Sequence, residues 1–176
     1  RSVFSSFEDT KNISKKKLIY TGPIVNTTLK RDEISLREKQ TIGFMGGSQG
    51  SKQINDYVYK FMESESHSSF DIIHVTGKSN EQLDIKSKNY QSMDFIEDMD
   101  YFYKDIDILV GRAGGGSLEA AYLGIPQILI PFKHGTTSSH QVLNAKYLEE
   151  KGFGFTVNSF EELITNIKYI SKDINN

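Results

Sequence analysis

The sequence has no cysteine among its 176 residues, no long hydrophobic run and little net charge. Without cysteine it can form no disulfide, no thiolate metal ligand and no cysteine nucleophile, which fits a reducing cytoplasm. No stretch approaches the roughly 20 apolar residues that span a bilayer. The formal net charge of -2 supplies no overall basic field, so we expect no nucleic acid as a main partner.

The composition is that of an ordinary soluble globular protein, with 37% hydrophobic, 25% charged and 11% aromatic residues. A chain of this length normally forms one domain and can bury a core of its own. Residue 1 is arginine rather than methionine, so we expect the chain to be a fragment or a processed product.

Short apolar runs alternate with helical patterns through most of the chain, which is typical of parallel βαβ units. Because such crossovers are right-handed, helices are expected on both faces of the sheet. The predicted fold class is therefore α/β, with a doubly wound parallel sheet. Strands are expected at residues 17–20, 41–45, 70–75, 92–95, 106–110, 127–130 and 153–157. Helices are expected at residues 54–62, 98–103, 117–123, 139–150 and 160–170.

A glycine-rich turn, GGSQGS at Gly46–Ser51, joins the second of these strands to the following helix. Ligands of doubly wound sheets bind outside the carboxyl ends of the strands, and free amides at a helix N-terminus favour phosphate. Ser48 could cap the helix and also donate to a phosphoryl oxygen. A tight turn with a serine cap explains the same residues without any ligand.

A second glycine-rich turn, GRAGGGS at Gly111–Ser117, follows the strand at 106–110. Glu119 comes next and is expected in the first turn of the helix. A carboxylate there gains from the helix dipole, which is a purely structural explanation. The alternative is that Glu119 accepts hydrogen bonds from two ribose hydroxyls. Spacing alone favours the structural explanation.

A third polar region begins with PFKH at 131–134 and continues into a helix that carries His140, Gln141 and Asn144. Gln141 and Asn144 are three residues apart, so they share one helix face where amides could bind sugar hydroxyls. An ordinary polar helix start is the alternative. His134 and His140 have no carboxylate at ligand spacing and no cysteine nearby, so we expect no metal site.

Together these regions resemble the C-terminal half of the bacterial transferases that move N-acetylglucosamine onto lipid-linked muramyl-pentapeptide. The likeness covers nearly the whole chain, and the three regions in order are far more specific than any one alone. The segments that carry it are FSSFEDT (4–10), YTGPIV (20–25), GGSQGSKQIN (46–55), IIHVTGK (72–78), MDFIEDM (93–99), RAGGGSLEAAYLGIP (112–126) and QVLNAKYLEEKG (141–152).

The resemblance implies a Rossmann-like domain, the C-terminal half of a two-domain GT-B glycosyltransferase. Residues 1–176 would then be a single UDP-sugar-binding domain, in which residues 1–16 lead in from a missing N-terminal domain. The resemblance also assigns roles to residues. The first turn would face the diphosphate, the segment at 93–99 would hold uracil, Glu119 would bind ribose, and the third region would contact the donor sugar. The implied substrate-binding residues are Gly47, Ser48, Gln49, Phe95, Ile96, Gly114, Gly115, Glu119, His134, Gln141 and Asn144.

Two departures from the family pattern affect these assignments. The family usually has Gly-Asn-Pro-Val-Arg where this chain has residues 22–26, so Asn26 cannot supply the charge of that arginine. The loop between Arg112 and Glu119 is one residue shorter than usual. Contacts carried onto Gly115 are affected by that shortening.

The implied function is the donor-binding part of a hexosyltransferase that uses UDP-N-acetylglucosamine in peptidoglycan synthesis. The resemblance places the general base, the lipid-linked acceptor site and the membrane-facing surface in the missing domain, so this chain would contain no catalytic residue. We expect no metal and no cofactor, and we expect the isolated chain to bind UDP weakly and transfer nothing. The full-length protein would be cytoplasmic, at the inner face of the membrane.

Other functions remain open on the sequence. One is a related transferase that acts on a diacylglycerol or polyprenol acceptor. A second is a UDP-N-acetylglucosamine 2-epimerase, and a third is the donor-binding subunit of a two-protein transferase. The segment at 4–25 argues against this third possibility, because it resembles the continuation of one two-domain chain.

Overall fold

The computed structural model describes residues 1–7, 10, 12–26, 28, 38–78, 80, 84–132 and 138–174, whose strands form two parallel sheets. The strands of the main sheet are β3 (Gln40–Met45), β4 (Phe70–Val75), β5 (Tyr90–Met93), β6 (Ile108–Gly111), β7 (Gln127–Leu129) and β8 (Gly154–Thr156). Their order across the sheet is β5-β4-β3-β6-β7-β8. The smaller sheet pairs β1 (Val3–Ser5) with β2 (Leu18–Tyr20).

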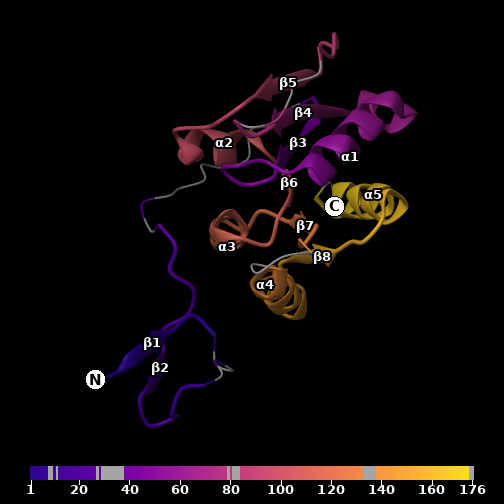
Figure 1. Ribbon diagram of the computed structural model, residues 1–176. Helices are drawn as coiled ribbons and strands as arrows, with labels where there is room; N and C mark the ends of the chain where they lie inside the picture. The colour runs from indigo at the N-terminus through magenta and orange to yellow at the C-terminus, as the bar shows by residue number, and fades with distance from the viewer. Residues whose placement is uncertain are drawn as a thin grey trace.

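Helices lie on both faces of the main sheet, as predicted (Figure 1). They are α1 (Lys52–Glu63), the short 3-10 helix η1 (Glu65–Ser69), α2 (Met99–Asp105), α3 (Gly115–Tyr122), α4 (Ser138–Glu150) and α5 (Phe160–Ile174). On one face, α1 and α5 pack Val58 and Ile167 against Phe44. On the other face, Phe102 of α2 packs against Leu109.

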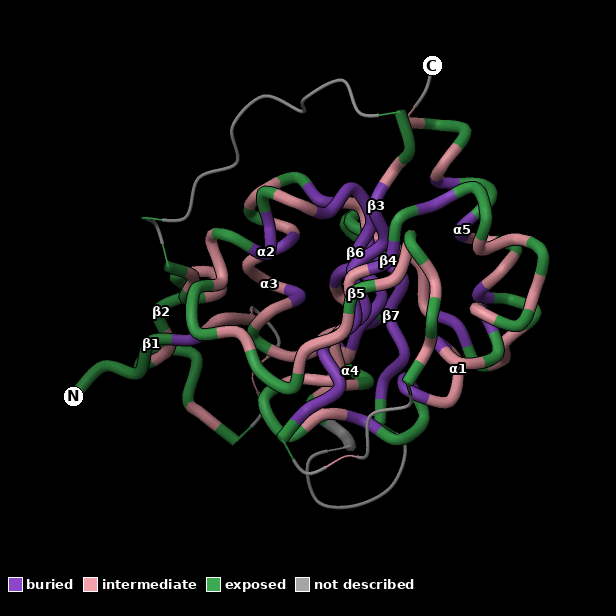
Figure 2. The backbone as a smooth tube through the Cα atoms, turned by 90° about the horizontal axis from the view of Figure 1, so that it is seen from above, coloured by how far each residue is buried: buried purple, intermediate pink, exposed green. Residues whose placement is uncertain are grey.

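Strand β6 shows how the sequence produces these two layers. Ile108 and Val110 face the cluster made with α1 and α5, while Leu109 faces the cluster made with α2 and α3. Successive side chains of a strand point to opposite faces, so a continuous apolar run suits a strand that is covered on both sides. The buried residues accordingly gather in the centre of the molecule (Figure 2).

The strand order contains one place where the chain changes direction across the sheet. From β3 the chain moves outward through β4 to β5, then returns to β6 on the other side of β3 and moves outward to β8. At the carboxyl ends of the central pair, Met45 of β3 lies opposite Gly111 of β6. Such a switch point opens a crevice between two loops that diverge, and ligands of open α/β sheets bind there.

The β1–β2 pair lies apart from the main sheet (Figure 1). Tyr147 of α4 contacts this part of the chain. Its ring packs edge-on against that of Phe7, just after β1, with the ring centres 5.2 Å apart. The hydroxyls of Tyr20 and Tyr147 are 3.4 Å apart. The sequence predicted β2, but not β1, which is three residues long and pairs with β2.

The predicted elements match the observed ones to within a few residues, and one difference matters for the site. Helix α3 begins at Gly115, not at residue 117, because Gly114 has an extended backbone and serves as the N-cap. Glu119 therefore lies in the second turn of α3, and the expectation that it lies in the first turn was wrong. No helix in the described ranges is long and apolar enough to cross a membrane.

Candidate functional site

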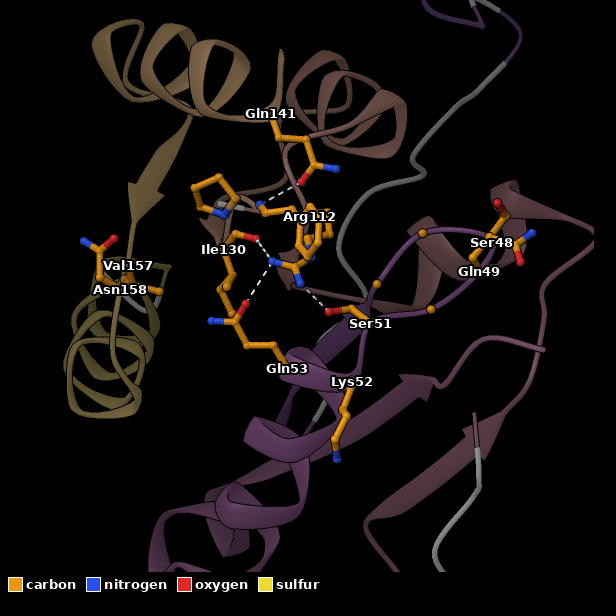
Figure 3. A pocket seen from close by; sticks show the side chains of 15 residues that line it. Ser48, Gln49, Ser51, Lys52, Gln53, Arg112, Ile130, Gln141, Val157 and Asn158 are labelled. Carbon is orange, nitrogen blue, oxygen red and sulfur yellow. Dashed lines mark hydrogen bonds between the residues drawn. The ribbon is translucent and has the colours of Figure 1, made fainter. Parts of the chain in front are cut away.

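A pocket of about 860 Å³ opens at the carboxyl ends of β3, β6, β7 and β8 (Figure 3). Its volume lies in the range of pockets that hold small ligands. The lining residues come from the first glycine-rich turn, the start of α1, and the segments that follow β6, β7 and β8. They are Gly46–Gln53, Arg112, Ile130–Phe132, Gln141, Val157 and Asn158.

The first glycine-rich turn has a backbone shape that needs glycine. Gly47 and Gly50 have φ angles of 86° and 74°, which other residues rarely adopt. The turn is closed by a hydrogen bond of 2.9 Å from Gly50 N to Gly47 O. Among the described residues, the amides of Gly47, Ser48 and Gln49 have no hydrogen-bond partner. Successive free amides beside a helix N-terminus form a binding site for an anion.

Ser48 does not cap α1, so that expectation was wrong. The cap is Ser51, whose backbone is extended and whose Oγ accepts a hydrogen bond of 3.3 Å from Ile54 N. A capping residue must immediately precede the helix, and the turn is three residues longer than a cap at Ser48 allows. Ser48 is exposed in the wall of the pocket, where its hydroxyl can contact a ligand.

The second glycine-rich turn lies against the end of β3. A Cβ atom at Gly116 would lie 2.8 Å from Met45 Cε and 3.3 Å from the Tyr103 hydroxyl, so α3 starts in close contact with the side chain at the end of β3. The helix has no side-chain cap at Gly114, which leaves its first amides without a side-chain partner. Both glycine-rich turns therefore lie at the same edge of the sheet. Had they opened onto opposite sides, no single nucleotide could touch both.

Glu119 is held in place by Tyr103. The hydroxyl of Tyr103 donates to Glu119 Oε2 at 2.9 Å and lies 3.1 Å from Gly116 O. Burial raises the pKa of Tyr103, and the bond to Glu119 raises it further, so the hydroxyl remains a donor. Because Glu119 is outside the first turn of α3, the helix dipole does not explain its presence. Oε1 has no hydrogen-bond partner among the described residues.

The two amides of the third region are used differently. Gln141 lines the pocket, and its Oε1 accepts a hydrogen bond of 2.9 Å from Phe132 N (Figure 3). Its amide N–H groups have no hydrogen-bond partner among the described residues. Asn144 donates from Nδ2 to Ala113 O at 3.0 Å and thereby connects α4 to the second glycine-rich turn. Asn144 is not part of the pocket wall. His134 lies outside the described residues.

Phe95 and Ile96 lie beyond the end of β5, outside the 860 Å³ pocket. Lys78 Nζ lies 4.1 Å from the centre of the Phe95 ring, which is 37% exposed. Ile96 is partly buried against the cluster beneath α2. Gly114, Gly115 and Glu119 also lie outside this pocket wall. The structure thus joins Gly47, Ser48, Gln49 and Gln141 in one pocket, and Phe95, Ile96, Gly114, Gly115, Glu119 and Asn144 are not part of its wall.

Sequence reasoning missed Arg112, whose side chain crosses between the two glycine-rich turns (Figure 3). Its Nη2 donates to Ser51 Oγ at 2.7 Å, and its Nη1 donates to Gln53 Oε1 at 3.0 Å and Ile130 O at 2.7 Å. Burial lowers the pKa of the guanidinium, but arginine keeps its proton in proteins.

All these acceptors are neutral, so no described carboxylate balances the charge of Arg112 in the pocket wall. The sequence signal was the position of Arg112 as the first residue after β6, at the switch point. Among the described residues there is no group of three or more His, Asp or Glu side chains that could hold a metal ion.

The strand order and the loops at the switch point define a Rossmann-like α/β domain of the kind that binds nucleotides in a crevice between two loops. Residues 41–175 match the family model described as the glycosyltransferase family 28 C-terminal domain. The chain belongs to this family and contains its C-terminal domain.

Two relatives illustrate how far the likeness extends. Both are named UDP-N-acetylglucosamine–N-acetylmuramyl-(pentapeptide) pyrophosphoryl-undecaprenol N-acetylglucosamine transferase. The protein from Bacillus cereus, form 3, is 31% identical over 152 residues, which cover 81% of this chain and 43% of the relative. The protein from Staphylococcus haemolyticus is 32% identical over 190 aligned positions, which cover 100% of this chain and 52% of the relative. The chain therefore spans about half the length of these relatives.

Solved structures confirm the fold. The MurG protein of Acinetobacter baumannii superimposes with a TM-score of 0.67 at 24% identity, over 86% of this chain and 49% of that one. A glycosyltransferase of kitacinnamycin superimposes with a TM-score of 0.71 at 14% identity, over 94% of this chain and 44% of that one. The predicted fold, the C-terminal half of a GT-B glycosyltransferase, is thus confirmed.

Proposed function

We propose that this chain is the donor-binding domain of a transferase that moves N-acetylglucosamine from UDP-N-acetylglucosamine to a lipid-linked muramyl-pentapeptide in peptidoglycan synthesis. The observation that carries the proposal is the meeting of both glycine-rich turns at the switch point of the sheet. The names of relatives at about 31% identity supply the donor and acceptor.

The diphosphate is proposed to bind against the first turn. The free amides of Gly47, Ser48 and Gln49 would donate to phosphoryl oxygens, helped by the hydroxyl of Ser48 and the N-terminus of α1. Arg112 would balance part of the charge on the diphosphate. These groups would also stabilise the negative charge that grows on UDP as the bond to the sugar breaks.

The uridine is proposed to extend from there toward β5. Glu119 would accept hydrogen bonds from ribose through Oε1, while Tyr103 holds Oε2. The amides of Gly114 and Gly115 lie at the same helix start. Phe95 and Ile96, beyond β5, would contact uracil.

The donor sugar is proposed to lie on the other side of the diphosphate, beside α4. The amide N–H groups of Gln141 would bind sugar hydroxyls, while its Oε1 accepts from Phe132 N. Asn144 holds the second turn through Nδ2 and would use Oδ1 toward the sugar. His134 remains a proposed contact on the strength of the resemblance alone.

Asn26 takes no part in this scheme. Its Oδ1 accepts hydrogen bonds from Thr28 N at 3.1 Å and from Thr28 Oγ1 at 2.7 Å, which is a local turn. Arg112 lines the pocket, as does Lys52, and would replace the charge of the arginine that the family usually has where this chain has Asn26.

We further propose that the acceptor site, the general base and the surface that meets the cytoplasmic face of the membrane lie in the half of the relatives that this chain does not span. The β1–β2 pair supports this. A two-stranded sheet is marginal alone, and parallel strands are normally covered on both faces. Phe4 and Ile19 in this pair are 69% and 43% exposed. Residues 1–16 would therefore lead in from a domain that completes this sheet.

Calorimetric titration of the 176-residue chain tests the proposal. We expect binding of UDP and of UDP-N-acetylglucosamine, a preference for the latter over UDP-glucose, and no sugar transfer. The 2′-deoxy nucleotide dUDP is a matched control, because it lacks only one hydroxyl that Glu119 would bind. Absence of binding to UDP, or equal affinity for UDP and dUDP, would contradict the corresponding part of the proposal.

A further inference from the structure

A chain of buried polar groups lies behind the first glycine-rich turn. His74 of β4 is fully buried, and its Nδ1 lies 2.8 Å from the hydroxyl of Tyr90. Its Nε2 lies 3.0 Å from Oδ1 of Asn55, a buried residue of α1. Asn55 in turn donates from Nδ2 to Thr76 O at 3.1 Å. None of these groups lines the pocket.

The hydrogen-bond directions in this chain are mutually consistent. Because Asn55 donates through Nδ2, its Oδ1 is the acceptor that faces His74, and Nε2 must carry the imidazole proton. Nδ1 then accepts from the hydroxyl of Tyr90. Burial lowers the pKa of His74 to about 4, so the ring is neutral at neutral pH. Every donor and acceptor of the ring is therefore satisfied.

Thr76 O connects this buried chain to the turn. Asn80 Nδ2 donates to Thr76 O at 3.0 Å and to Gln49 O, inside the turn, also at 3.0 Å. Gly50 and Gly77 add a direct backbone contact, because a Cβ atom on either would overlap the other residue. The turn is thus held from behind, on the side away from the pocket.

We propose that His74, Asn55 and Asn80 are positioning residues for the diphosphate: they fix the carbonyl of Thr76 and, through it, the turn Gly46–Ser51, so that its free amides face the pocket before a ligand arrives. The inference rests on the proposed function, because it assumes that the turn binds phosphate. A turn that is ordered in advance loses less conformational entropy on binding.

The polar nature of this support also favours a positioning role. A buried imidazole and a buried amide are costly unless all their hydrogen bonds are made, whereas apolar side chains would fill the same space without that requirement. A hydrogen-bond chain fixes orientation as well as position. Its end point is the carbonyl beside the turn that carries the proposed phosphate contacts.

Binding of UDP and of uridine to the 176-residue chain tests the inference. Asn80 is half-buried, and Asn80→Ala removes only its two hydrogen bonds to Thr76 O and Gln49 O, so the fold should survive. We expect its affinity for UDP to fall about three- to ten-fold, on the usual scale for neutral hydrogen bonds. His74→Phe should weaken UDP to a similar extent, and His74→Gln, which can still donate to Asn55, should restore part of the loss. Affinity for uridine, which has no phosphate, should stay unchanged throughout.

The core variant Ile167→Val on α5 is the matched control for lost stability, and all proteins are compared at a temperature where they are folded. It should bind UDP like the original chain. If the original chain binds no UDP, the proposed function fails. If that chain binds but folded Asn80→Ala binds UDP equally well, or loses UDP and uridine affinity alike, the positioning role is overturned. Should His74→Phe fail to fold, Asn80→Ala decides the matter.

Discussion

The two glycine-rich turns meet at one edge of the sheet, but they are held in different ways. The first, Gly46–Ser51, ends in a serine cap and is supported from behind by hydrogen bonds from Asn80. The second, Gly111–Ser117, starts a helix without a side-chain cap; its own Arg112 donates to Ser51, and Asn144 of α4 donates to its Ala113. The two turns therefore have similar glycine content but different structures. The first presents the backbone amides of a loop, and the second presents the amides at the start of a helix.

Substitution of Gly50 should break the first construction and give the largest loss of stability. Gly50→Ala places a methyl group at positive φ where it overlaps Thr76 O, so we expect a loss of about 2–5 kcal/mol. Gly47→Ala is the matched control, because φ is also positive there but no atom lies within 4 Å. It should cost only about 1–2 kcal/mol. Urea unfolding measures both, and equal losses would show that the turn is not supported from behind.

The buried imidazole behind the same turn should make stability depend on pH. The pKa of His74 is lowered to about 4 in the folded chain, whereas an unfolded histidine has a pKa of 6.5. The unfolded state therefore binds a proton first as the pH falls. The free energy of unfolding therefore has its full value, as far as His74 is concerned, above pH 6.5. It falls as the pH drops from 6.5 to 4, by about 3 kcal/mol in total.

Urea unfolding between pH 7 and pH 4 tests this titration, with His74→Phe as the comparison. The original chain should lose more stability on acidification than the variant does. The difference between the two curves should be confined to the interval between the two pKa values. Parallel curves would contradict a neutral buried ring.

Glu119 tests whether the second turn takes part in nucleotide binding. If its carboxylate accepts charged hydrogen bonds from ribose, Glu119→Ala should cost about 1.5–3 kcal/mol of UDP binding, which is roughly a ten- to hundred-fold loss of affinity. Glu63→Ala, at the far end of α1, is a control that should leave binding unchanged. Calorimetry that shows unchanged UDP binding in Glu119→Ala would remove ribose recognition from the scheme.

The two serines of the first turn should give the smallest effects, and they should differ in kind. Ser51→Ala removes the cap of α1 and should lower the free energy of unfolding by about 1 kcal/mol. Ser48→Ala should change stability by less than about 0.5 kcal/mol. It should nevertheless weaken UDP about two- to ten-fold through a lost hydrogen bond. If Ser48→Ala lowered stability and Ser51→Ala weakened UDP binding instead, the roles of the two serines would be reversed.

Much of the candidate site could be predicted from the local pattern of residues in the sequence. The strand at 106–110 and the glycine-rich segment after it could be predicted because strand and helix periodicities are properties of neighbouring residues. Two such turns at carboxyl ends of parallel strands had to lie at one edge of the sheet. The role of Ser48 as a cap was wrongly predicted, because a cap is chosen by backbone angles. Residue type does not distinguish Ser48 from Ser51 as the cap, and the sequence alone does not give the backbone angles that do.

By itself, the sequence determined the doubly wound fold and the pair of glycine-rich turns, since both depend on short-range periodicity and on residues that adopt special backbone angles. Only the tertiary structure decided that Arg112 reaches Ser51, that Asn144 holds Ala113, and that His74 supports the turn through Asn55. These contacts join residues far apart along the chain. Their geometry exists only once the strands have taken their order in the sheet.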